Sequence, residues 1–195
     1  MFFKKVVISL FCLVSFIAIA RECYSKNVDE LLSKSGFDAQ DSKKINELYV
    51  NIKKLDVEED KVLLIIENSI KGGVDSTQLL RILTLISKMA VEDIPPKALI
   101  NKVLEGFAKG APIEVIIKEA ESKVLSLKNA KSILNYLILK GFEVKQPDLA
   151  VNIISIYLTK GWTPSSLKLE IESGGLNKQE FHELSLFLKS SDVKK

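Results

Sequence analysis

The side chains of this chain that could carry chemistry are mainly carboxylates on either side of one helix join. Glu105, Glu114 and Glu119 flank the stretch Lys-Gly-Ala-Pro, and two carboxylates that face each other across a cleft are typical of glycoside hydrolases. Each glutamate precedes a lysine by four residues, a spacing that forms solvated ion pairs on a helix. These lysines are Lys109, Lys118 and Lys123. We therefore interpret the carboxylates as members of surface ion pairs.

The other reactive residue types are too few for the usual sites. The single histidine, His182, is expected on a solvated helix face opposite Phe181 and Leu184. A zinc site needs several Cys or His ligands. There is no Gly-x-Ser-x-Gly elbow and no phosphate-cradling loop. We predict no catalytic residue, no cofactor-binding residue and no metal ligand.

Three residues have a structural and a functional interpretation. Trp162 and Tyr157 could form an exposed aromatic patch, but Trp162 directly follows Gly161 and is expected to pack on the helix that ends there. Gly106 lies inside a helix at a cost of about 1 kcal/mol relative to alanine. We expect it to permit a close approach of two helices.

Apolar residues recur at intervals of three and four along the whole chain, which predicts amphipathic helices. Examples are Ile45, Leu48, Tyr49 and Ile52. Helices are expected over 41–55, from Asp56 to Lys71, over 75–90, after Pro96, after Pro112, over 129–140, after Pro147, after Pro164 and from Asn177. No segment alternates with period two, so no sheet is expected. The helices expected to be most buried contain Leu79–Met89, Ile133–Leu139 and Leu149–Leu158.

Lys-Gly pairs end several of these helices, at Gly72, Gly110, Gly141 and Gly161, and Gly36 occupies a similar place. Glycine reaches a positive φ at the C′ position, and lysine complements the helix dipole. The first two intervals, 36 and 38 residues, match a helical hairpin, and the later ones shrink to 31 and 20. We therefore predict an all-α fold of antiparallel hairpins that forms a degenerate helical-repeat array or an irregular bundle, and we favour the array.

The N-terminus reads MFFKKVVISLFCLVSFIAIA, with two lysines, an apolar run and Ala18-Ile19-Ala20 at its end. This pattern predicts a signal peptide over 1–20 that is cleaved before Arg21, although an uncleaved anchor is the alternative. Neither Cys12 nor Cys23 follows a lipobox, so a periplasmic or secreted protein is expected. Cys23 would remain as the single cysteine, either unpaired or in an intermolecular disulfide.

The remaining chain would consist of an N-terminal segment over 21–38, partly flexible, one helical domain over 39–190 and a disordered tail over 191–195. Its 26 basic and 25 acidic residues give a net charge of +1. No basic cluster interleaves with aromatic residues, so nucleic-acid binding is not expected. No stable membrane insertion is expected after cleavage.

The stretch IPPKALINKVLEGFAKGAPIEVI resembles a pattern in an uncharacterised family of exported all-α bacterial proteins, in which an apolar helix ends in "EGLAKGVP". The similarity extends over about Asp93 to Leu167 and includes DLAVNIISIYLTKGWTPSSL. The resemblance implies an exported, all-α bacterial protein, and it brings no activity with it.

Three functions fit these patterns. Stacked hairpins create grooves for a protein or peptide, which favours a non-catalytic interaction module. Nearly all-apolar helices could instead enclose an apolar ligand. A carboxylate-based hydrolase of the cell envelope is the third alternative. The sequence does not specify an oligomeric state.

Overall fold

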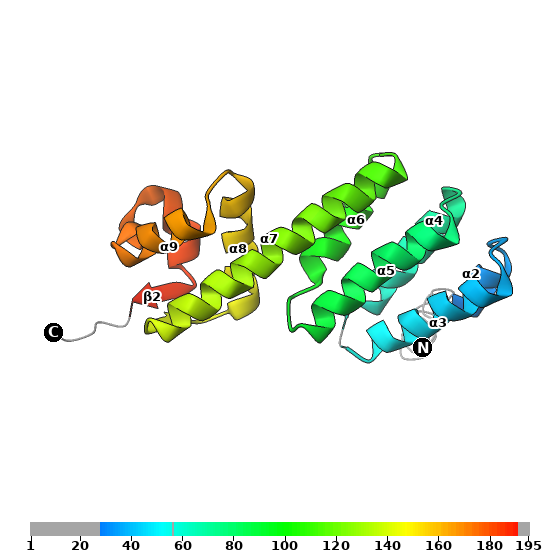
Figure 1. Ribbon diagram of the computed structural model, residues 1–195, viewed down its shortest axis with the longest axis horizontal. Helices are drawn as coiled ribbons and strands as arrows, with labels where there is room; N and C mark the ends of the chain where they lie inside the picture. The colour runs from blue at the N-terminus through cyan, green and yellow to red at the C-terminus, as the bar shows by residue number, and fades with distance from the viewer. Residues whose placement is uncertain (1–27, 56, 191–195) are drawn as a thin grey trace, which may run out of the picture.

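The computed structural model describes residues 28–55 and 57–190, which form a stack of helical hairpins followed by a smaller C-terminal unit (Figure 1). The predicted all-α class is confirmed, apart from one short β-ribbon. The hairpins are α2 (Val28–Ser33) with α3 (Ala39–Lys53), α4 (Glu59–Lys71) with α5 (Ser76–Val91), and α6 (Lys97–Ala108) with α7 (Ile113–Leu139).

The hairpins stack in two layers. In one layer α3 packs against α5 and α5 against α7, and in the other α2 packs against α4 and α4 against α6 (Figure 1). Each helix thus meets its counterpart in the next hairpin, which is the geometry of an array. Val28 and Leu32 of α2 belong to the common core, so the helical region begins before residue 39. The predicted signal peptide, Cys23, Asp56 and residues 191–195 lie outside the described residues.

The array has a regular period that is set by glycines with positive φ. Gly36, Gly73 and Gly110 have φ of 76°, 68° and 64°. The intervals from 36 to 73 and from 73 to 110 are both 37 residues. The prediction that Gly72 terminates its helix in this way is wrong by one residue, because Gly72 is still right-handed with φ −81°. The Val74 N–H then donates to the Ser69 carbonyl at 2.9 Å, which closes the turn around Gly73.

Helix α7 is continuous over 27 residues and corrects the prediction of two helices separated near residues 125–128. The segment from Leu125 to Lys128 contains neither glycine nor proline, and Leu127 within it is fully buried. The helix is therefore about 40 Å long. Its first half packs against α5 and α6, and its second half packs against the C-terminal unit.

The C-terminal unit contains α8 (Pro147–Thr159), α9 (Pro164–Glu172), the 3₁₀ turns η1 (Gly175–Asn177) and η2 (Gln179–Phe181), and α10 (His182–Ser185). Strands β1 (Phe142–Val144) and β2 (Leu188–Ser190) pair antiparallel, with Glu143 opposite Lys189. The expectation of no sheet is thus wrong, because three-residue strands are too short to show an alternating pattern. The predicted helix from Asn177 is also wrong over its first residues, since this segment forms two 3₁₀ turns that bury Phe181.

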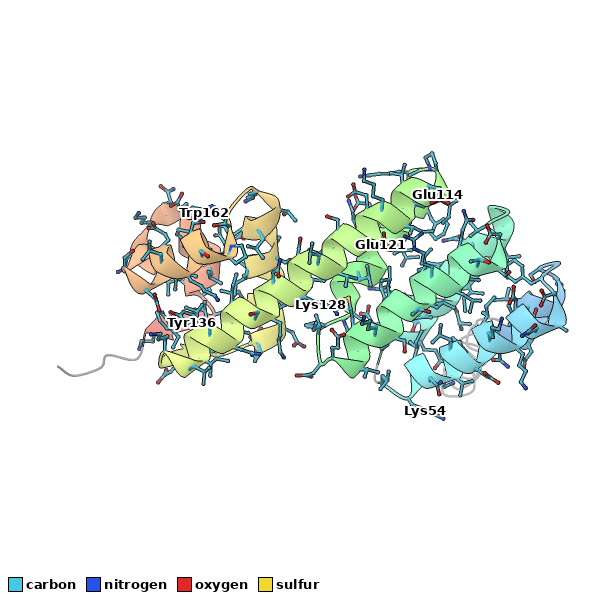
Figure 2. All side chains as sticks on the ribbon, viewed as in Figure 1. Lys54, Glu114, Glu121, Lys128, Tyr136 and Trp162 are labelled. Carbon is cyan, nitrogen blue, oxygen red and sulfur yellow. The ribbon has the colours of Figure 1, made fainter. Side chains whose placement is uncertain are left out.

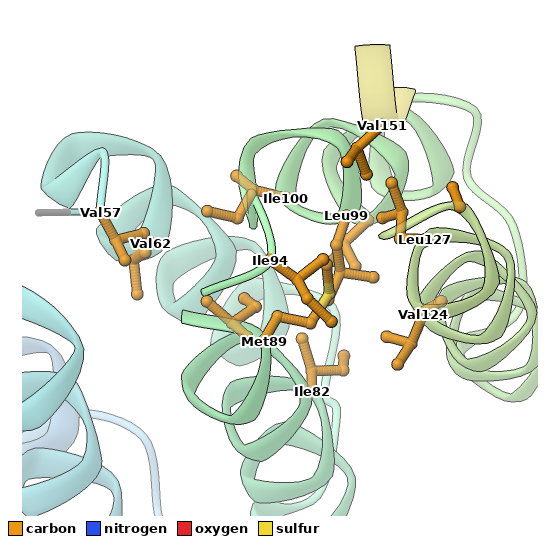
Figure 3. Close-up of a cluster of buried hydrophobic side chains, with 14 of the residues drawn as sticks. Val57, Val62, Ile82, Met89, Ile94, Leu99, Ile100, Val124, Leu127 and Val151 are labelled. Carbon is orange, nitrogen blue, oxygen red and sulfur yellow. The ribbon is translucent and has the colours of Figure 1, made fainter. Parts of the chain in front are cut away.

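One hydrophobic core runs through the array, and Figure 3 shows the part of it where α5, α6 and α7 meet. The prediction for α5 is confirmed, because its inward face is fully buried. The buried residues are Leu79, Ile82, Leu83, Ile86 and Met89. The prediction for Ile133–Leu139 fails at its end, where Leu139 is 86% exposed. Leu137 is buried, and a residue two places further along a helix points to the opposite side. On α8, Leu149 is exposed while Ala150, Val151 and Ile154 are buried.

Within the described ranges, no helix is both long enough and apolar enough to cross a membrane.

Candidate binding groove

Polar contacts hold α7 in a fixed register against α5 and the turn that follows α5, from Glu114 to Lys131 of α7. Arg81 donates through Nε and Nη2 to Glu121 Oε1, at 2.9 and 2.6 Å. The remaining contacts join Gln78 to Glu114, Lys128 to Glu92 and Lys131 to Asp93. Figure 2 shows Glu114, Glu121 and Lys128 following one another along α7. Each exposed pair adds little stability, but together they fix where the rest of α7 lies.

On a different face of α7, a groove of about 470 Å³ opens between α6 and α8. The side chains of α7 form its floor. Its lining is mixed, with apolar Ala98 and Ile156 beside charged and amide groups. These polar residues are Asn101, Lys102, Glu105, Glu119, Ser122, Lys123, Asn152 and Thr159. The groove is partly open to solvent, so a polypeptide segment could reach its lining.

Lys123 is the most unusual residue of this groove. Its Nζ donates to Ser155 Oγ at 2.9 Å, and Ser155 is fully buried and donates in turn to the Asn152 carbonyl at 2.7 Å. Burial lowers the pKa of the Lys123 amine, and the nearby charge of Lys102 lowers this pKa further. Among the described residues Lys123 has no carboxylate partner. A half-buried cation without a counter-ion is a frequent feature of binding sites.

Asn152 contributes a second unusual group. Within the described part of the chain, its Oδ1 atom is buried and accepts no hydrogen bond. An unpaired buried acceptor is costly, so such atoms generally have a partner in the functional state. The Asn152 Oδ1 atom is thus an unpaired acceptor that lies beneath the groove surface, whereas the Lys123 amine has N–H donors beyond the one that it uses on Ser155.

The three glutamates singled out by their spacing have different partners. Glu105 pairs with Lys109 as predicted, and this contact holds the pKa of the Glu105 carboxyl below its usual value. Glu114 instead accepts from Gln78 on α5 at 2.7 Å. Glu119 pairs with Lys102 on α6 at 3.6 Å, so the predicted pair with Lys123 is wrong. Lys123 turns to α8 because Ser155 offers it an acceptor there.

The sequence pattern did not identify Lys123 or Asn152 as site residues, although one signal for them existed. Asn152, Ser155 and Thr159 lie on a narrow polar stripe of the otherwise apolar α8. A stripe of this kind usually faces solvent, but Ser155 is fully buried here. A buried polar residue on such a stripe requires a polar partner, which in this case is Lys123 of α7.

The structural interpretations of the aromatic residues and of Gly106 are confirmed. Phe181 lies between Tyr157 and Trp162, with ring centroids 5.0 and 5.3 Å apart. The backbone N–H of Trp162 donates to the Tyr157 carbonyl at the end of α8, and the indole ring meets the Phe181 ring edge-on. Figure 2 shows Trp162 in the C-terminal unit, well away from the array. Gly106 faces Ile116 of α7 in close contact. His182 is exposed on α10.

A second groove, of about 530 Å³, lies between the C-terminal end of α5, α7 and α9. Its cations already have partners. Lys128 and Lys131 pair with Glu92 and Asp93, and Lys168 lies 4.6 Å from the centre of the Tyr136 ring. The groove between α6 and α8 contains Lys123, a half-buried cation without a carboxylate partner among the described residues, and we regard it as the candidate site.

In the part of the chain that the structure describes, no group of three or more His, Cys, Asp or Glu residues is placed to hold a metal ion. Comparisons of this chain with protein families, with curated proteins and with solved structures found no match.

Proposed function

We propose that this protein is a non-catalytic, exported helical module that binds a protein or peptide partner in the groove between α6 and α8. The observation that carries the proposal is Lys123, a half-buried cation in an open groove that has no carboxylate partner among the described residues. Helical arrays commonly bind extended chains in grooves between their repeats.

The character of the groove favours a polypeptide over an apolar ligand. Carriers of apolar molecules enclose them in predominantly hydrophobic cavities. Here the lining includes Lys102, Glu119 and Asn152, and the groove is open to solvent. A polypeptide offers both charged and amide groups to such a lining.

The state of the glutamates favours binding over hydrolysis. A glycosidase acid needs a raised pKa so that it is protonated at neutral pH. Contact with Lys109 lowers the pKa of Glu105, and Glu119 pairs with Lys102. The Glu105 carboxyl thus lies beside a lysine that favours its ionised form.

Site-specific photo-crosslinking tests the binding proposal. A photoreactive amino acid replaces Ser122, which lines the groove, or Lys88, which is exposed on α5. We expect a defined crosslinked species in the native envelope from position 122 only. Excess wild-type protein should compete with its formation, whereas excess Lys123→Gln protein should not. Equal capture at both positions, or equal competition by both proteins, would contradict the proposal.

Export is tested separately by N-terminal sequencing of the protein recovered from the medium or periplasm. We expect a chain that begins at Arg21. Recovery of the full chain with Met1 in the membrane fraction would indicate an uncleaved anchor.

A further inference from the structure

The amine of Lys123 lies in the groove without an acidic partner among the described residues. Its Nζ is 2.9 Å from the neutral hydroxyl of Ser155. Both glutamates of the lining have other partners, because Glu105 pairs within α6 and Glu119 pairs with Lys102. The ammonium form of Lys123 is therefore less well stabilised than that of a lysine in an ion pair.

The hydrogen bonds around Ser155 leave the lone pair of this amine unused. The Ser155 hydroxyl donates its single hydrogen to the Asn152 carbonyl at 2.7 Å, so its oxygen can only accept from Lys123. A neutral amine has two N–H groups and one lone pair. One N–H is enough for the contact with Ser155. Lys123 can thus attack an electrophile through its lone pair without first breaking this contact.

The surroundings of Lys123 favour its neutral form. Burial lowers the pKa of the amine, and the charge of Lys102 on α6 lowers this pKa further. The groove residues of α8 are Asn152, Ile156 and Thr159, none of which carries a charge. A desolvated lysine beside a second cation is one of the arrangements that make an amine nucleophilic at neutral pH.

The lining also limits what this amine can meet. Ile156 is 40% exposed, and Ala98 of α6 lines the same groove of about 470 Å³. A short hydrocarbon chain beside these two residues would remove apolar surface from water. The fitting electrophile thus carries a reactive carbon at one end and a short apolar chain at the other.

We propose that Lys123 captures short aliphatic aldehydes as a covalent imine in the groove between α6 and α8. The amine nitrogen adds to the carbonyl carbon, and one amine hydrogen passes to the carbonyl oxygen. The carbon–oxygen bond of this carbinolamine then breaks as the C=N bond forms. The oxygen leaves as water with both amine hydrogens, so the step needs neither an oxidant nor a reductant. This capture goes beyond the binding of a polypeptide and does not depend on it.

Reductive trapping of the purified protein tests the inference. Butanal and cyanoborohydride are added at pH 7, and peptide mass spectrometry measures the initial rate of labelling at each lysine. We expect Lys123 to be labelled about threefold or more faster than Lys88 and Lys118, which are exposed on α5 and α7. A pKa lower by one unit gives about tenfold more neutral amine, and partial burial offsets some of this gain. Labelling of Lys123 at the rate of the exposed lysines, or more slowly, would overturn the inference.

Two variants test the cause of the reactivity. Lys102→Gln should slow the labelling of Lys123 about twofold or more, because it removes the cation that favours the neutral amine. Lys109→Gln, which removes an exposed cation at the edge of the groove, should leave the rate unchanged. Circular dichroism verifies that both variants are folded. An unchanged rate in folded Lys102→Gln would also overturn the inference.

The crosslinking experiment at position 122 separates this inference from the proposed function. A specific crosslink together with unselective labelling would retain the interaction module and reject only the capture of aldehydes. Selective labelling of Lys123 without a crosslink would support the capture of aldehydes and reject the polypeptide partner.

Discussion

Gly106 of α6 and Ile116 of α7 approach so closely that a Cβ atom on Gly106 would lie 2.7 Å from Ile116 Cγ1. This contact is possible only because residue 106 lacks a side chain. It brings the backbone of α6 against the floor-forming helix of the groove, next to Glu105. The glycine lowers the helix propensity of α6 locally, and it permits the close packing of the two helices.

Gly106→Ala should therefore reduce the free energy of unfolding by about 1–3 kcal/mol, although alanine is the better helix former. Urea denaturation measures the change. In the background of Ile116→Ala the same substitution should cost much less, because the clashing atoms are removed. An equal cost in both backgrounds would show that the contact is not the cause.

Gly110→Ala should lower stability by about 1–2 kcal/mol, because residue 110 has a φ of 64° that alanine adopts only with strain. No neighbouring atom lies within 4 Å of the added Cβ, so the effect comes from the backbone alone. Lys109→Ala, which removes the exposed pair with Glu105, should leave the denaturation midpoint almost unchanged. Loss of partner binding by folded Lys109→Ala would instead identify this join as a recognition surface.

Leu83→Asp should cost about 3–5 kcal/mol, because Leu83 is fully buried in α5 and the new carboxylate would have no partner there. Lys88→Ala lies on the exposed side of the same helix and should be nearly neutral. Thermal or urea unfolding of both variants provides the comparison. The reverse ranking would mean that the orientation of α5 is wrong.

Lys123→Met should leave stability at pH 7 unchanged or raise it, because it removes a charge that burial disfavours. The folded-state pKa of Lys123 lies below the usual value of 10.5, so the unfolded chain binds the proton more tightly. The wild type should therefore gain stability relative to Lys123→Met as the pH rises toward 10.5. Urea titrations of both proteins between neutral pH and this value test the sign. A constant difference across this range would contradict the pKa shift.

Local sequence signals predicted where several helices begin, but they did not predict the contacts between helices. Asp75 and Thr163 form capping boxes with Gln78 and Ser166, and such local signals correctly start their helices. The prediction that the helix containing Leu79–Met89 is mostly buried is also confirmed. The long α7 was divided wrongly near residues 125–128, where Leu127 is fully buried and Lys128 contacts Glu92 just after the end of α5. Intrahelical spacing carries no information about partners on another helix.

The contacts of Lys123 at the candidate site were not predicted for the same reason, because its partner lies on another helix. Lys123 follows Glu119 by four residues, and a local pattern therefore pairs them. In the structure Glu119 lies nearer to Lys102 of α6, and Lys123 reaches Ser155, which is 32 positions later in the chain. Such contacts depend on how the helices cross. The unpaired Asn152 Oδ1 likewise becomes visible only when burial is known.

The 37-residue period of the positive-φ glycines determines where a repeat unit could be duplicated in the sequence without disturbing the stack. A duplicated unit that ends at one of these glycines would enter the stack as a further hairpin, with its inward face in register on both sides. A further hairpin could be inserted between the first hairpins of the stack. It could not be inserted after Gly110, because the second half of α7 packs against α8 and both helices line the groove. Relatives of this protein that differ by whole hairpins would thus vary at the N-terminal side of α6 and keep a constant binding end.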